Sequence, residues 1–230
     1  MRIGGLTQNT LTSPHMQKFD FNTIDHFDYH INSSINGYAL LDGLIMNICS
    51  FYAKKEEAVV DLGCTSGRLI SKLATEYPDS ICIGYDITDN NFLTESKALL
   101  SKQDITEDDF ELPSCNIILS VFTLQFLKYA HRIKLLKKIY DALNPTGVFI
   151  ICEKEIVDDG NFQEVFTFAN YDYKKHHFTS EEILQKEYDL RKIMNCMSVG
   201  GNEKLFKEAG FTRITSFFQS LNFKGWLCMK

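Results

Sequence analysis

The sequence lacks a long apolar run, a surplus of basic residues and any closely spaced pair of cysteines. A helix that crosses a membrane needs roughly 20 consecutive apolar residues, and no stretch of this chain approaches that length. The first residues also lack the basic head and apolar block of a secretory signal peptide. We therefore predict a soluble, cytoplasmic protein that makes no contact with a membrane.

The charge balance is acidic, with a formal net charge of −6. An acidic surface repels a phosphate backbone, so this balance disfavours direct binding to nucleic acid. The seven cysteines are widely and irregularly spaced, and no CxxC pair occurs. This spacing indicates neither a zinc site nor a thiol redox site. We expect buried cysteines in a reducing compartment and no bound metal.

The 230 residues, 44% of them hydrophobic, fit one large α/β domain. We predict a flexible leader over 1–18, which is polar and rich in turn formers, and a single domain over 19–230 with a helical insertion at about 158–200. Helical and almost continuously apolar strand patterns alternate, as a parallel sheet covered on both faces requires. The predicted strands are 58–63, 81–86, 115–122 and 148–154, with a terminal antiparallel hairpin over 212–220 and 223–230, and the predicted helices are 38–52, 68–77, 90–100, 131–143 and 203–211.

The stretch AVVDLGCTSGRL, residues 58–69, places two glycines directly after a predicted strand. A nucleoside-phosphate P-loop is excluded because no lysine follows the second glycine. A dinucleotide-binding turn is disfavoured because Thr65 and Arg68 stand where that turn needs glycine. The remaining match is the D-x-G-x-[GST]-x-G turn of class I methyltransferases, which binds S-adenosylmethionine (SAM). It is formed here by Asp61, Gly63, Thr65 and Gly67.

Three acidic residues stand at or just beyond successive predicted strand ends. Asp61 can receive the ammonium group of SAM, and Asp86 can accept hydrogen bonds from the ribose hydroxyls. Asp104 follows the third strand region, where this fold contacts the adenine edge. Each acid alone is compatible with a solvated loop or a helix cap, but ligands of open sheets bind at the carboxyl ends of the strands. Together they favour a Rossmann-like class I methyltransferase fold with a seven-stranded, mostly parallel sheet.

The segments FTLQFL (122–127) and LLKKIYDALNPTGVFIICEK (135–154) resemble the carboxy-S-adenosyl-L-methionine synthases of tRNA wobble-uridine modification. The resemblance extends over most of the chain, including ILQKE, FKEAGF and FFQSLNFKGWL. It implies that prephenate donates its carboxyl group to the methyl group of SAM while aromatising to phenylpyruvate. It also implies a homodimer, no metal, and a separate carboxymethyltransferase that consumes the product.

The resemblance also implies which residues surround the cofactor. By the motif match, these are Tyr38, Gly63, Cys64, Thr65, Asp86, Ile87, Asp104 and Ile105. A further position that contacts the ligand, an asparagine in the family, is Val121 here. A second departure replaces the family arginine that pairs with the new carboxylate by Glu187. Because Arg191 lies one helical turn later on the same face, we predict that the charge pair has exchanged ends and that both residues serve the reaction centre.

Two other functions remain open. An ordinary SAM-dependent methyltransferase for a small-molecule acceptor would keep the scaffold and use Glu187 as a general base. A SAM-binding protein without catalysis is less favoured, because the insertion at 158–200 indicates a pocket for a second substrate. The basic segment 171–177 within the insertion is compatible with binding a dicarboxylate or with a solvated helix end.

Overall fold

The computed structural model describes residues 27–230, and the predicted leader over 1–18 lies outside that range. The described residues form a seven-stranded sheet in the order β3-β2-β1-β4-β5-β7-β6. The strands are β1 (Ala58–Leu62), β2 (Ile81–Asp86), β3 (Leu99–Lys102), β4 (Cys115–Val121), β5 (Leu143–Lys154), β6 (Arg213–Ser220) and β7 (Phe223–Met229). β1 to β5 pair in parallel, and β7 is antiparallel to both β5 and β6. The predicted fold class is therefore confirmed.

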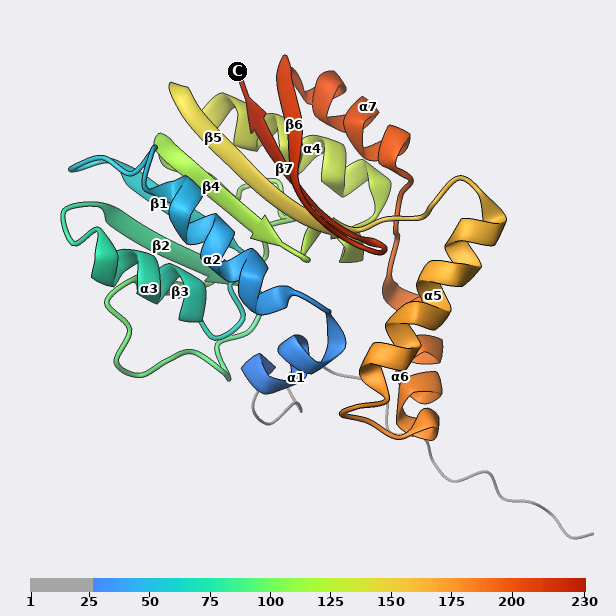
Figure 1. Cartoon of the computed structure of the whole chain (residues 1–230). Helices are drawn as coiled ribbons and strands as arrows, with labels where there is room; N and C mark the ends of the chain where they lie inside the picture. The colour runs from blue at the N-terminus through green and yellow to red at the C-terminus, as the bar shows by residue number, and fades with distance from the viewer. Residues whose placement is uncertain (1–26) are drawn as a thin grey trace, which may run out of the picture.

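Helices cover both faces of this sheet (Figure 1). The helices are α1 (Phe27–Ser34), α2 (Tyr38–Cys49), α3 (Arg68–Glu76), α4 (Tyr129–Ala142), α5 (Gly160–Lys174), α6 (Ser180–Ile193) and α7 (Val199–Ala209), with a short 3-10 helix, η2 (Leu124–Phe126). α2 and α3 pack on one face, and α4 and α7 pack on the other. No helix in the described part of the chain is long and apolar enough to cross a membrane.

The buried strands explain why the sequence reads as almost continuous apolar runs. In β4, Ile117 faces the core beneath α2 and α3, whereas Ile118 faces the core beneath α4 and α7, and both are fully buried. Successive side chains of a strand point to opposite faces, so a sheet covered on both sides needs apolar residues at every position. All the cysteines are free, and only Cys196 is not buried, as the composition predicted.

The predicted helix over 90–100 is wrong. This segment forms turns and then β3, which pairs with β2 from Leu99 onward. The hydroxyl of Ser96 bonds both to the backbone N–H and to the carbonyl of Ala98, and the N–H of Leu93 donates to the carbonyl of Ser66. Short polar side chains that bond the local backbone compete with helix formation, and here they hold the turns that lead into the edge strand.

The predicted helical insertion contains α5 and α6, which stand beside the sheet rather than on its faces (Figure 1). α6 begins with a capping box, in which the side chain of Thr179 and that of Glu182 each bond the other residue's backbone N–H. The hydroxyl of Tyr173 on α5 donates to the carbonyl of Asn32 on α1 at 2.7 Å. The insertion is thereby joined to α1, and the two together close over the carboxyl ends of the central strands.

Candidate active site

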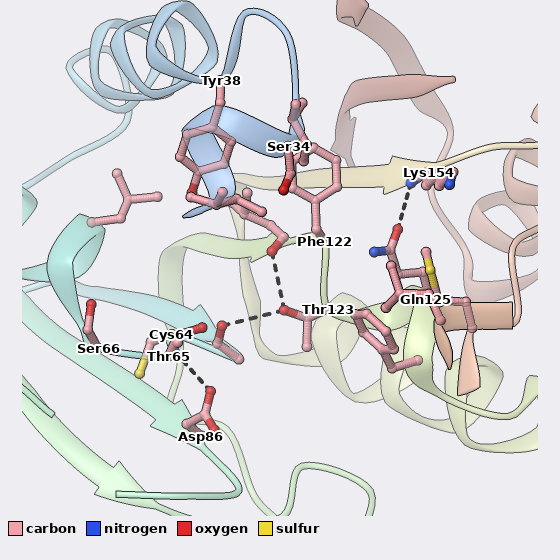
Figure 2. Close-up of a pocket in the computed structure, with 18 of the residues that line it drawn as sticks. Ser34, Tyr38, Cys64, Thr65, Ser66, Asp86, Phe122, Thr123, Gln125 and Lys154 are labelled. Atoms are coloured by element: carbon pink, nitrogen blue, oxygen red, sulfur yellow. Dashed lines mark hydrogen bonds between the residues drawn. The ribbon is translucent and has the colours of Figure 1, made fainter. Parts of the chain in front are cut away.

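A cavity of about 330 Å³ lies at the carboxyl ends of β1, β2 and β4, beneath α1 and α6. Sheet residues, residues of the first two helices and residues of the insertion all line it. Figure 2 shows Thr65 and Asp86 on one side of this pocket, and Gln125 and Lys154 on the other. The position agrees with the rule that open α/β sheets bind ligands beyond the carboxyl ends of their strands.

The glycine turn forms part of the cavity wall on the side of Thr65 and Asp86. Gly63 has a φ of 77° and its N–H donates to the carbonyl of Tyr85 at 2.8 Å. A Cβ atom on Gly63 would lie 2.3 Å from the side chain of Thr123, so no other residue fits without displacing that side chain. Gly67, with a φ of 76°, precedes the first turn of α3 and packs against Leu100 without reaching the cavity.

Asp86 fixes the shape of this turn. Its Oδ2 accepts from the backbone N–H of Thr65 at 2.9 Å, and its Oδ1 accepts from that of Thr88 at 3.1 Å (Figure 2 draws the first bond). Burial raises the pKa of Asp86, while these backbone donors lower it. A carboxylate oxygen has more than one lone pair, so Asp86 can still accept bonds from hydroxyl groups of a ligand in the cavity.

Asp61 lies deeper on the same side and is only 3% exposed. Burial, followed by the negative charge of Asp86, raises the pKa of Asp61 to about 7 against the opposing charge of Arg68. Arg68 is engaged by Asp42, which accepts from both of its terminal nitrogens. A cationic group that enters the cavity near Asp61 would favour ionisation of this carboxyl, so the site is suited to an ammonium ligand.

Most of the other predicted cofactor residues also line the cavity, namely Tyr38, Cys64, Thr65, Ile87 and Val121. Asp104 and Ile105 do not. Oδ1 of Asp104 accepts from the backbone N–H and the hydroxyl of Thr106, at 2.8 and 2.7 Å, and Ile105 is buried in the core. The structure thus brings Asp61, Gly63 and Thr65 of the glycine turn together with Asp86 at the end of β2, but it leaves out Gly67 and the predicted pair that follows β3.

The opposite side of the cavity carries three lysines and one glutamate from three elements. Lys154 ends β5, Lys174 lies on α5, and Lys186 and Glu187 lie on α6. Lys174 Nζ donates to Glu187 Oε1 at 2.7 Å, and Lys154 Nζ donates to Glu187 Oε2 at 3.4 Å. Burial would raise the pKa of Glu187, but the two lysines lower it to about 2. Glu187 is therefore an ionised counter-ion of this cluster.

Arg191 does not take part in this cluster. It is exposed and lines a shallow groove along α6, together with Tyr171 and Tyr188. The basic segment 171–177 divides in a similar way, because Lys174 is 4% exposed and faces the cavity while Lys175 is exposed. Sequence reasoning singled out Arg191 but did not identify the lysines at 154 and 186.

A buried polar network supports the wall of the cavity that carries the FTLQFL segment. The backbone N–H of Gln125 donates to Glu153 at 3.1 Å, and the side-chain oxygen of Gln125 accepts from the backbone N–H of Lys154 at 2.7 Å. Arg132, 2% exposed, lies 3.6 Å from Glu153. Burial raises the pKa of Glu153 to about 8 against the charge of Arg132. The network joins η2 to β5 and so fixes Gln125 at the edge of the cavity.

Comparison with known proteins supports the fold of this chain. Residues 59–147, which include the glycine turn, match the family described as Methyltransferase domain. The solved structures of human N-acetylserotonin methyltransferase with SAM and of PigF with SAH share the fold, with TM-scores of 0.52 and 0.54 at 18% and 16% identity. Each match covers 76% of this chain but only 47% and 50% of those chains, so this chain spans about half of their length.

Curated relatives match over almost the whole chain. The carboxy-S-adenosyl-L-methionine synthase of Aliivibrio fischeri is 30% identical over 225 residues, which cover 92% of each protein. The carboxy-S-adenosyl-L-methionine synthase of Nautilia profundicola is 29% identical, and the match covers 93% of this chain and 94% of that protein. The chain therefore belongs to the carboxy-S-adenosyl-L-methionine synthase family and is a SAM-dependent transferase.

Proposed function

We propose that this protein transfers the carboxyl group of prephenate to the sulfonium methyl group of SAM and so forms carboxy-SAM. The observation that carries the proposal is the division of one cavity into two ends of opposite charge. Asp61 and Asp86 line one end, and the three lysines at 154, 174 and 186 line the other. A cationic cofactor and an anionic second substrate can therefore occupy the same cavity side by side.

The residues at the acidic end fit SAM. The backbone at Gly63 leaves no room for a side chain, the carboxyl of Asp61 is buried where an ammonium group would favour its ionisation, and Asp86 has free acceptor capacity for a ribose. When bound, SAM supplies a methyl carbon activated by the sulfonium charge. The chain's own part is to hold both ends of the cofactor so that this methyl group faces the second substrate.

The lysine end fits a dicarboxylate. Three lysines and Glu187 leave two positive charges when all four groups are ionised. Prephenate carries two carboxylates, one that is transferred and one that stays on its side chain, so it would neutralise this surplus. The negative charge of Glu187 is already balanced by Lys154 and Lys174. Replacement of the family arginine by Glu187 is therefore compatible with an anionic substrate.

Aromatic and aliphatic side chains form much of the remaining wall and restrict water around the reacting groups. The apolar residues that line the cavity include Phe122, Phe126, Leu190, Met194 and Phe223. Prephenate would lose CO2 as its ring aromatises, and the deprotonated methyl carbon of SAM must capture that CO2 before it escapes. A small, dry cavity favours capture because it keeps the two fragments close and excludes competing protonation by water.

The alternative function is methyl transfer to a small-molecule acceptor, with Glu187 as the general base. The two ion pairs of Glu187 argue against this role, because a carboxylate with a pKa of about 2 is a weak base at neutral pH. Formation of S-adenosylhomocysteine that depends strictly on an added neutral or cationic acceptor would favour the alternative.

The direct test is mass spectrometry of the product formed from SAM and prephenate labelled with ¹³C in its ring carboxyl group. We expect carboxy-SAM that carries the label. Lys174→Met should raise the KM for prephenate about tenfold or more, whereas Lys175→Met, which changes the exposed neighbour, should leave it within about twofold. Absence of a carboxylated product at saturating prephenate would overturn the proposal.

We also propose that the protein is a homodimer and that a separate carboxymethyltransferase uses its product to modify a tRNA wobble uridine. Support for self-association comes from apolar side chains exposed on the insertion, namely Phe162, Val165 and Phe168 on α5 and Leu184 and Tyr188 on α6. Such patches commonly mark interfaces. Sedimentation of the wild type as a dimer and of Phe168→Glu as a monomer is expected. A monomeric wild type would refute the assembly.

A further inference from the structure

Lys186 differs from the other two lysines of the cavity in its contacts. Its Nζ contacts Nε2 of His30 on α1 and donates to the hydroxyl of Ser34 at 3.2 Å. Two nitrogen atoms in contact can share a hydrogen bond only when one of them offers a lone pair, so the pair cannot be fully protonated. Lys174 donates to the carboxylate of Glu187 at 2.7 Å.

The surroundings of the pair determine where the proton resides. Lys174 on α5, Lys154 on β5 and Glu187 on α6 are the charged groups of the described chain that face it. Burial, and after it the charges of Lys186 and Lys174, lowers the pKa of His30 to about 4, which makes its ring neutral at pH 7. Burial and the charge of Lys174 lower the pKa of Lys186 to about 7, although Glu187 opposes them.

We propose that Lys186, paired with His30, is a catalytic residue that carries a proton between the two substrates. This inference rests on the proposed function. The position of Lys186 on the cavity wall, on the same helix as Glu187, places its Nζ at the end where the second substrate would lie. An amine that exchanges its proton near neutral pH can act first as a donor and then as an acceptor.

The proposed step is balanced in protons and electrons. The bond between the prephenate ring and its carboxyl group breaks, and its electron pair enters the ring as the hydroxyl group departs. The ammonium of Lys186 donates a proton to that hydroxyl group, which leaves as water. The neutral amine then accepts a proton from the sulfonium methyl group, whose electron pair forms the new carbon–carbon bond to CO2. Lys186 returns to its starting state, and the reaction needs no oxidant or reductant.

The first test measures the ionisation of Lys186 without relying on turnover. Trace labelling with acetic anhydride over a range of pH, followed by peptide mass spectrometry, reports the pH at which each lysine becomes reactive. We expect an inflection for Lys186 near pH 7. Lys174→Met should move this inflection to higher pH, because it removes the positive charge that lowers the pKa of Lys186 most. An inflection of Lys186 above pH 9 in the wild type would overturn the inference.

The second test separates proton transfer from binding. Lys186→Arg keeps a positive charge but cannot release its proton near pH 7, so it should retain SAM affinity within about threefold and lower the rate of carboxy-SAM formation about 100-fold or more. Lys192→Arg, at an exposed position of the same helix, is the matched control. Thermal unfolding checks that both variants fold, and Lys186→Met serves as a second variant.

The outcomes distinguish the two proposals. If the wild type forms carboxy-SAM and Lys186→Arg does so within tenfold of its rate, the proton-transfer role is wrong while the proposed function stands. If the wild type forms no carboxy-SAM at all, the proposed function fails, and the inference that depends on it fails with it. A pH–rate profile with an inflection near 7 that is absent from Lys186→Arg would support both.

Discussion

Replacing Asp86 by alanine should abolish measurable binding of SAM. Asp86 accepts from the backbone N–H of Thr65 at 2.9 Å and lines the cavity, and its carboxylate keeps lone pairs for further hydrogen bonds. A hydrogen bond to a charged group contributes about 1.5–3 kcal/mol. Loss of two such bonds to ribose hydroxyls therefore costs about 3–6 kcal/mol, which corresponds to a decrease in affinity of about 10²- to 10⁴-fold.

Isothermal titration calorimetry with S-adenosylhomocysteine measures this loss without turnover. Asp89→Ala is the matched control, because Asp89 is an exposed residue of the same loop that pairs with Lys102 at 3.0 Å. We expect the control to bind within about twofold of the wild type. Asp86→Asn keeps one acceptor oxygen but loses the charge, so its affinity should be intermediate. Normal affinity in a folded Asp86→Ala protein would show that the cofactor binds elsewhere.

Three further changes test other parts of the site. The affinity for the cofactor should rise as the pH rises through about 7, because Asp61 must ionise to receive the ammonium group. Calorimetry should find that the affinity of Asp61→Asn depends less on pH. Glu187→Arg should lower the free energy of unfolding by about 3–5 kcal/mol, because it adds a cation beside two lysines. Its melting temperature should fall by about 10 °C, whereas that of the exposed control Glu164→Arg should not. An unchanged melting temperature would refute that account of the cluster. Gly63→Ala should weaken binding at least tenfold because its Cβ would lie 2.3 Å from a neighbouring side chain, whereas Gly43→Ala, with open space around it, should bind normally.

The sheet could be predicted from the sequence because strands buried on both faces are almost continuously apolar. The burial of every residue of β1 and of all but the last residue of β4 accounts for that signal. The edge strand β3 has exposed ends and no such run, so the sequence pattern does not distinguish it and the segment before it from a helix. Its true conformation depends on Ser96 and on a backbone bond to Ser66, which is distant in sequence.

The acidic end of the cavity could also be predicted, because Asp61, Gly63 and Thr65 are adjacent in sequence. The lysine end could not, because its members come from a strand and two helices that are far apart along the chain. The one local signal for the lysine end is Lys154, which is the last residue of a mostly apolar strand. Glu187 and Arg191 share one face of α6, so the position of that helix along the cavity decides that Glu187 and not Arg191 lines it, and no local pattern determines that position.

The most direct test of the central claim is the mass of the nucleoside product formed from SAM in the presence and absence of prephenate. The two charged ends of the cavity predict a product that is heavier than SAM by one carboxyl group and appears only when prephenate is present. If SAM remains unchanged at saturating prephenate while the protein still binds it, the lysine end does not serve carboxyl transfer and the proposed function is wrong.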